Sequence, residues 1–176
     1  MTAIQDQVIL VTGSTDGIGK QTAHDLASMG ATVLLHGRVQ ERAVSTLQEI
    51  YAATGNNQLE YYLADFSSLA SVRRLAAEVQ AKHNCLNVLI NNAGIGAGNC
   101  KDRLRALSQD GYQLRFAVNY LAPFLLTHLL LPFCARRRPH GLSTWPLKDS
   151  SQLILMMSCW NDITTPCRLT AKVNWL

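Results

Sequence analysis

The chain has 176 residues, of which 48% are hydrophobic and 16% are charged, and its formal net charge is +4. A chain of this length and composition can bury a real core, which excludes disorder throughout and favours a globular domain. The most concentrated basic run, residues 136–138, has no interleaved aromatic residues and no recognisable nucleic-acid module around it. We therefore expect no nucleic-acid partner.

Five cysteines, an odd number without a C-x-x-C pair, argue against a disulfide framework and against a zinc site. The five histidines are scattered, and an isolated histidine is more often structural or exposed than a ligand. We expect no metal and a reduced, cytosolic location. The first expected strand begins at Val8, which leaves no room for a signal segment. Residues 121–133 are apolar but short and interrupted by prolines, so we expect a buried helix and no membrane span.

From residue 7 to about residue 131, short β-branched apolar runs alternate with longer amphipathic segments. This alternation is typical of βαβ units around a parallel sheet. The expected strands are residues 8–12, 32–36, 59–63 and 88–91. The expected helices are residues 17–29, 40–53, 69–83, with a serine cap at Ser67 or Ser68, and 111–131. The predicted fold class is α/β, a Rossmann-like doubly wound parallel sheet that is incomplete at its C-terminal side.

A glycine-rich turn follows the first expected strand and opens the first expected helix. Its residues are Gly13, Ser14, Thr15, Asp16, Gly17, Ile18 and Gly19. Gly13 permits a tight bend, while Gly17 and Gly19 let the backbone approach a pyrophosphate and let the helix pack on the sheet. The N–H groups and the dipole of the helix N-terminus then provide an anion site. Ordinary strand-to-helix turns also use such glycines, so the turn alone is weak support for a nucleotide.

Three further motifs follow in chain order: Ala64-Asp65-Phe66, Asn91-Asn92-Ala93-Gly94 and Val118-Asn119-Tyr120. With the glycine turn, this set resembles the short-chain dehydrogenase/reductase family, in particular its retinol-dehydrogenase-like branch, over roughly the first three quarters of the chain. The resemblance implies that residues 13–19 bind the pyrophosphate of a dinucleotide and that Asp65 binds the adenine ring. It also implies that Asn91, Ala93 and Gly94 line the ribose side, and that Asn119 is the family's helix asparagine, which holds a water in the proton relay.

The choice of cofactor depends on charge at the end of the second expected strand. A carboxylate there would bind the ribose 2′-hydroxyl of NAD and repel a 2′-phosphate. This chain instead has His36-Gly37-Arg38, and Arg38 can make charge-assisted bonds to a phosphate. NADP(H) is therefore favoured over NAD(H), although a solvated surface arginine would give the same pattern.

The resemblance also implies a Tyr-x-x-x-Lys motif, because proton transfer to the substrate oxygen needs a tyrosine with a nearby lysine. The last tyrosine of this sequence is Tyr120. Residues 153–158 superficially resemble the family's fifth strand ending in its catalytic serine, but no tyrosine follows Ser158. Lys172 has Arg168 four residues before it, where the motif requires tyrosine. We expect this chain to lack turnover.

After Pro132 the alternation of apolar runs and amphipathic segments stops. Codon degeneracy suggests an explanation for this change. A reading frame that starts at each codon's third base forces Ala, Asp, Leu, Glu and Leu at five positions of the tail. It permits the strings A-R-I-V-N-V-A-S, I-D-F-D-D-V-M-L-E-R and Y-C-Q-S-K-L-A, the last with the missing Tyr and Lys at their spacing. Our hypothesis is a frameshift by loss of one base at or near the Pro132 codon. Residues 1–132 are then the NAD(P)-binding domain, and residues 133–176 are a non-native tail that leaves the product marginally stable or aggregation-prone.

Three interpretations of function stay open at this point. The first is an NADP-dependent oxidoreductase by descent, interconverting an alcohol and a carbonyl on a lipophilic small molecule, and inactive as written. The second is a non-catalytic nucleotide-binding or regulatory fragment. The third takes the tail as genuine, with Ser158 catalytic and Lys172 as its partner. Neither the substrate nor a homo-oligomeric state can be read from these residues.

Overall fold

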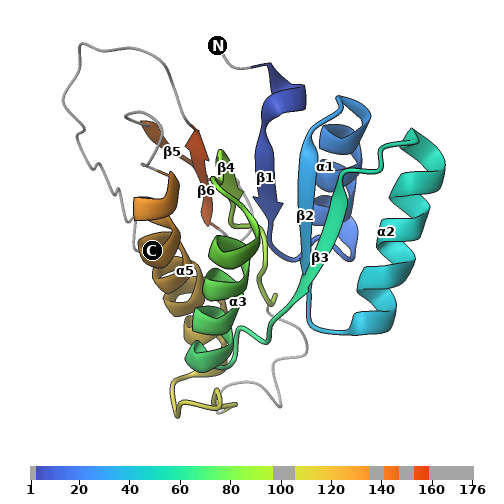
Figure 1. Cartoon of the computed structure of the whole chain (residues 1–176). Helices are drawn as coiled ribbons and strands as arrows, with labels where there is room; N and C mark the ends of the chain where they lie inside the picture. The colour runs from blue at the N-terminus through green and yellow to red at the C-terminus, as the bar shows by residue number, and fades with distance from the viewer. Residues whose placement is uncertain (1–2, 97–105, 135–140, 147–152, 159–176) are drawn as a thin grey trace.

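The computed structural model describes residues 3–96, 106–134, 141–146 and 153–158. Within these residues, six strands form one sheet in the order β3-β2-β1-β4-β6-β5 (Figure 1). The strands are β1 (Val8–Val11), β2 (Thr32–Gly37), β3 (Leu59–Leu63), β4 (Val88–Ile90), β5 (Gly141–Pro146) and β6 (Leu153–Ser158). Strands β1 to β4 are all parallel. The predicted Rossmann-like parallel sheet is confirmed over these four strands.

Three helices connect the parallel strands, as the alternating pattern predicts: α1 (Gly17–Ser28), α2 (Gln40–Thr54) and α3 (Leu69–Lys82). The short η1 (Ile4–Asp6) precedes β1, and α4 (Leu114–Phe116), the π-helical η2 (Ala117–Leu121) and α5 (Ala122–Cys134) follow β4. The cap of α3 is Ser68, whose hydroxyl accepts a hydrogen bond from the Ser71 N–H at 3.4 Å. Ser67, the other predicted cap, accepts a hydrogen bond from Gln109 instead.

The helices cover both faces of the sheet, α1 and α2 on one side and α3 and α5 on the other (Figure 1). Successive side chains of a strand point to opposite faces. In β1, Ile9 and Val11 therefore pack in the cluster with α1 and α2, whereas Leu10 packs in the cluster with α3 and α5. Strands buried on both faces need almost continuous apolar sequence, which explains the short β-branched runs.

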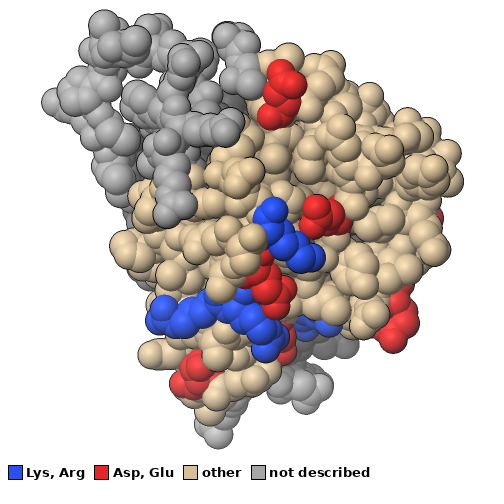
Figure 2. Space-filling view, viewed as in Figure 1, with Lys and Arg blue, Asp and Glu red and all other residues tan. Residues whose placement is uncertain are grey.

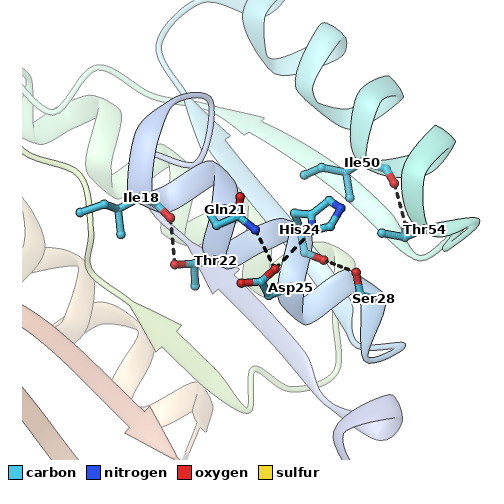
Figure 3. Close-up of polar contacts among 8 residues, drawn as sticks. All are labelled: Ile18, Gln21, Thr22, His24, Asp25, Ser28, Ile50 and Thr54. Carbon is cyan, nitrogen blue, oxygen red and sulfur yellow. Dashed lines mark hydrogen bonds and ion pairs between the residues drawn. The ribbon is translucent and has the colours of Figure 1, made fainter.

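The surface of these helices is polar and mixed in sign. On α1, the Thr22 and Ser28 hydroxyls donate to carbonyl oxygens of Ile18 and His24, both at 2.9 Å (Figure 3). Figure 2 shows Lys and Arg side chains interspersed with Asp and Glu over α3, where Arg74 and Glu78 form an ion pair. On this face the charges compensate each other locally and form no continuous basic surface.

The helix that begins at Leu114 differs from its prediction at both ends. Gly111 has a φ of +81° and belongs to the preceding turn, so the helix starts three residues later than expected. It continues through Pro132 to Cys134, and Phe133 is buried in the core. Residues 114–133 also have the length and mean hydropathy, 1.5, of a membrane-crossing helix, although 39% of that window is buried inside the fold.

The edge of the sheet beyond β4 departs from the parallel pattern. Strand β6 runs antiparallel to β4, and β5 pairs antiparallel with β6 as a hairpin partner. Ser158 therefore lies opposite Val88, at the amino end of β4. The predicted site residues lie at the opposite end of the strands, where the parallel strands have their carboxyl ends.

Candidate functional site

The glycine turn connects β1 to α1 at the carboxyl edge of the sheet. Gly13 has a φ of +66°, and a Cβ at this position would lie 2.8 Å from the Ala93 Cα. A Cβ on Gly19 would collide with the Asn92 Nδ2 and with the Gly13 carbonyl. Gly17 has a φ of +52°, and a Cβ there would meet only open space. The first and third glycines are thus required by close packing, and the second by its backbone conformation.

The N-terminus of α1 faces the open side of this turn. Helix α1 has 12 residues, and the N–H groups of its first turn lack helical partners, which makes a helix start favourable for an anion. The Asp16 carboxylate accepts the Gly17 N–H at 2.8 Å. A phosphate bound at this end would therefore share the helix N-terminus with Asp16. Ile18 is 63% exposed and projects away from the helix body (Figure 3).

A clamp of hydrogen bonds joins the glycine turn to the turn after β4. The Thr12 hydroxyl accepts the N–H groups of Asn92 and Ala93 at 2.9 and 3.0 Å, and it donates to the Ile90 carbonyl at 3.2 Å. The Asn92 side-chain amide donates to the carbonyl oxygens of Thr12 and Gly13, both at 3.0 Å. The two turns therefore form one rigid unit.

The turn after β4 is also tied to the helix that carries Asn119. The Asn119 Oδ1 accepts the Ile95 N–H at 2.8 Å, and its Nδ2 donates to the Ile95 carbonyl at 3.1 Å. Asn119 lies in the π-helical segment η2, and such segments occur frequently at functional sites. Both side-chain groups are used for positioning this turn. An open hollow of about 490 Å³ lies beside it, lined by Gly94, Ile95, Gly96, Ala106, Leu114 and Arg115.

Asn91 lies deeper than its neighbours, with 3% of its surface exposed. Its Nδ2 donates to the Thr127 hydroxyl on α5 at 3.0 Å. Within the described residues, its Oδ1 is a buried oxygen without a hydrogen-bond partner. Leaving a buried acceptor unpaired is unfavourable, so Asn91 marks a place where the described fold does not satisfy its own polar groups.

At the end of β2, His36 is buried and Arg38 is exposed. Burial lowers the pKa of His36 to about 4, against the opposite effect of its bond to the Ala64 carbonyl, and the positive charge of Arg38 lowers it further. Among the described residues, none forms a hydrogen bond or an ion pair with the Arg38 guanidinium. The guanidinium is therefore available to a ligand. The arrangement is a neutral buried ring next to an exposed cation.

Asp65 follows β3 and completes this edge. Burial acts to raise the pKa of its carboxyl, but hydrogen bonds from Ser67, the charge of Arg38 and a hydrogen bond from Gln109 outweigh it, so the pKa is lowered. The Ser67 N–H donates to Oδ1 at 2.9 Å, and the Gln109 amide donates to Oδ2 at 3.1 Å. The carboxylate is therefore charged and held in one orientation.

The structure brings the predicted site residues to one edge of the sheet, but in different settings. Gly13, Gly17, Gly19, Ala93 and Gly94 form the paired turns. The Ser14 hydroxyl is buried and accepts the His36 N–H at 2.9 Å, so it braces the turn from beneath. The Thr15 side chain packs against Gly37, since a Cβ at that glycine would lie 2.5 Å from the Thr15 methyl group. Their predicted contacts with a cofactor stay predictions.

Sequence reasoning missed four residues that hold this edge together. Asn92 belongs to the Asn91-Asn92-Ala93-Gly94 motif, and Thr12 ends the first expected strand, but the sequence does not indicate their hydrogen bonds. His36 was set aside with the other scattered histidines, although it stands two residues before Arg38. Gln109 gave no signal, because its contact with Asp65 spans 44 positions. Among the residues that the structure describes, no group of His, Cys, Asp or Glu side chains is arranged to hold a metal ion.

Comparison with known proteins gives the family. The profile of the family described as "short chain dehydrogenase" matches residues 7–141. Mouse Retinol dehydrogenase 11 is 42% identical over 125 residues, covering 71% of this chain and 38% of that protein. Human Polyprenol dehydrogenase is 38% identical over 126 residues, covering 72% of this chain and 37% of that protein.

A solved short-chain dehydrogenase from Shigella flexneri, complexed with NADP, has a TM-score of 0.62 at 32% identity. The match covers 73% of this chain and 53% of that one. The chain spans about a third of the length of the curated relatives that it matches. The fold, the paired turns and these matches agree: the chain belongs to the short-chain dehydrogenase family, as a retinol-dehydrogenase-like member.

Proposed function

We propose that this chain binds NADP(H) at the carboxyl edge of β1 to β4, and that it derives from an oxidoreductase that interconverts an alcohol and a carbonyl on a lipophilic small molecule. The observation that carries the proposal is the rigid pair of turns, in which Gly13 and Gly19 leave no room for side chains and Gly17 faces open space. This geometry allows a backbone to approach a pyrophosphate closely. The cofactor would supply the hydride, and the protein would bind and orient it.

The preference for NADP(H) rests on charge. The exposed guanidinium of Arg38 is available to a 2′-phosphate, and charge-assisted bonds of this kind are among the stronger ones in proteins. The related Shigella protein was solved with NADP, which supports the same choice. Asp65, charged and fixed by Ser67 and Gln109, would meet the adenine side. The names of the retinol and polyprenol dehydrogenases support a lipophilic alcohol as the substrate class.

The proposal includes the absence of turnover by this chain. Hydride transfer needs a group that gives or takes a proton at the substrate oxygen. No tyrosine follows Tyr120 in the sequence, and β6 carries Ser158 at the edge opposite to the paired turns. We retain residues 1–132 as the nucleotide-binding unit and residues 133–176 as out-of-frame sequence. A cytosolic location, which the odd number of cysteines favours, completes the proposal.

Titration of the full chain with NADPH and with NADH, followed by calorimetry, tests the proposal. Saturable binding that is tighter for NADPH is expected. Arg38→Ala should weaken NADPH binding by roughly tenfold and leave NADH binding unchanged, because a charge-assisted bond to phosphate is lost. Arg73→Ala, which removes an exposed cation from α3, is the matched control. Absence of saturation with both nucleotides would overturn the proposal.

A further inference from the structure

His36 occupies the carboxyl end of β2, between the glycine turn and the segment that follows β3. Its ring is buried, with 2% of the residue exposed, and it stacks on the Phe66 ring with centroids 4.5 Å apart. Its two ring nitrogens contact different strand connections. Nδ1 lies 3.1 Å from the Gly13 nitrogen, and Nε2 lies 3.1 Å from the Ala64 carbonyl oxygen.

The partners of this ring determine its tautomer. A backbone N–H can only donate, so Nδ1 must accept from Gly13 and carries no proton. A carbonyl oxygen can only accept, so Nε2 must carry the proton and donate to Ala64. The ring is therefore neutral. Burial lowers the pKa of His36, which agrees with this state. Protonation would also place an N–H of Nδ1 against the Gly13 N–H.

The backbone of His36 adds two further bonds to the same turn. The Ser14 N–H donates to the His36 carbonyl at 3.0 Å, and the His36 N–H donates to the Ser14 hydroxyl at 2.9 Å. Main chain and ring together connect the glycine turn, the end of β2 and the end of β3. These are the three places to which the proposed cofactor site assigns the pyrophosphate, Arg38 and the adenine ring.

We propose that His36 is a positioning residue for the dinucleotide, which holds the Gly13 turn against the Ala64-Asp65 segment so that both meet the cofactor at once. This inference rests on the proposed binding of NADP(H). Arg38 would distinguish the two cofactors through the 2′-phosphate. His36 acts on the parts of the site that serve the pyrophosphate and the adenine, which NADPH and NADH share, so its loss should weaken both equally.

Two amide variants separate the bonds of the ring. In His36→Asn, the side-chain oxygen can take the place of Nδ1 and accept from Gly13. In His36→Gln, the longer side chain can place its amide near the position of Nε2 and donate to Ala64, leaving the Gly13 N–H without its acceptor. Each variant keeps only one of the two bonds, so we expect both variants to bind NADPH and NADH roughly tenfold more weakly than wild type. Melting temperatures of the two variants control for general damage.

The outcomes distinguish this inference from the proposed function. If wild type does not saturate with NADPH, the proposed function fails. If wild type binds but either variant binds both nucleotides as tightly as wild type, or only one of the two nucleotides is bound more weakly, the positioning role is wrong.

If a variant does not fold, a nitrogen NMR spectrum of the wild-type chain still tests the positioning role of His36. We expect His36 to be protonated at Nε2 only, with ring resonances that shift on addition of NADPH while those of the peripheral His24 do not. The other tautomer, or unchanged His36 resonances with NADPH bound, would overturn the inference.

Discussion

The two sides of β4 differ in how completely their polar groups are paired. On the β1 side, the Thr12 hydroxyl accepts two hydrogen bonds and donates one, and the Asn92 side-chain nitrogen donates two. Beyond β4, β6 arrives antiparallel. Asn91, whose amide nitrogen bonds to Thr127 on α5, retains a buried oxygen without a partner among the described residues. The side that carries the proposed cofactor site is built by contacts within the first 120 residues. The far side depends on whatever sequence follows Pro132.

The largest expected effect concerns catalysis, which needs both sides. If the frameshift hypothesis is correct, restoring the alternative reading frame after codon 132 should give NADPH oxidation with a lipophilic aldehyde, at least about a hundredfold above the present chain, because that frame would supply a positioned proton donor. Sequencing of the coding DNA across codon 132 is the first measurement, and initial rates at 340 nm are the second. Equal rates of NADPH oxidation by the present chain and by the chain with the restored frame would contradict this prediction.

The next effect tests how tightly the cofactor side is packed. Gly13 and Gly55 have nearly equal φ values, +66° and +68°, but only a Cβ on Gly13 meets other atoms, 2.8 Å from the Ala93 Cα. We expect Gly13→Ala to lower the free energy of unfolding by roughly 4 kcal/mol, from backbone strain plus overpacking. Gly55→Ala should lower it by only about 1 to 2 kcal/mol, from strain alone. Urea unfolding measures both, and equal losses would mean that the turns are not in close contact.

A pH effect on stability follows from the buried ring of His36. The unfolded chain binds a proton at the ordinary pKa of 6.5, whereas the folded chain resists protonation until about pH 4. The unfolded state thus binds more protons between these values, and the free energy of unfolding falls by roughly 3 kcal/mol as the pH drops from 6.5 to 4. The charged groups near the ring are Arg38 and Asp65, and the lowered pKa of Asp65 adds a loss only below its ordinary 3.8.

His36→Asn is the control for this pH effect, because it removes the titrating ring and keeps an acceptor for Gly13. Unfolding by urea at pH 7, 6, 5 and 4.5 should show a steep decline for wild type and a flatter one for the variant. A variant curve parallel to that of wild type would show that other groups cause the decline.

The smallest effect compares two neighbouring asparagines that follow β4, Asn92 with contacts to the glycine turn and Asn91 with a contact to α5. Asn92→Ala removes two hydrogen bonds and leaves the Thr12 and Gly13 carbonyl oxygens without these donors. It should therefore lower the free energy of unfolding by about 2 kcal/mol. Asn91→Ala removes one bond and also a buried unpaired oxygen, so we expect a loss below about 1 kcal/mol. Thermal unfolding of both variants measures the difference. A larger loss for Asn91 would mean that its oxygen has a partner beyond the described residues.

The sequence predicted the parallel half of the fold because its signals are local. The apolar runs of the first four strands, the glycine turn and the serine cap each act within a few residues, and their ends agree with the structure to one or two positions. The last helix was predicted to end before Pro132, but it continues to Cys134. A proline removes one helical hydrogen bond, but burial of Phe133 on the next position keeps the chain helical to Cys134.

The candidate site was predicted as a set of motifs, not as a set of contacts. Arg38, Asp65 and the glycines were found because chemistry and spacing single them out. The bracing role of Ser14 and His36 depends on a contact across 22 positions, and the contact of Gln109 with Asp65 spans twice that distance. Neither the periodicity of the apolar residues nor the composition of the chain indicates which distant residues contact each other. The antiparallel direction of β6 was likewise beyond a pattern that shows only that residues 153–157 are apolar.

The close approach of Gly13 to Ala93 links two motifs that lie 80 positions apart. Because the Ala93 Cα already touches the space where a Gly13 side chain would stand, neither position can enlarge while the other keeps its place. The Thr12 hydroxyl, which receives the N–H of Ala93, fixes that spacing further. Substitutions in the two turns should therefore be strongly non-additive, and a variant that is harmful in one turn becomes tolerable only when the other turn moves with it. The two glycine-containing turns therefore behave as one structural unit.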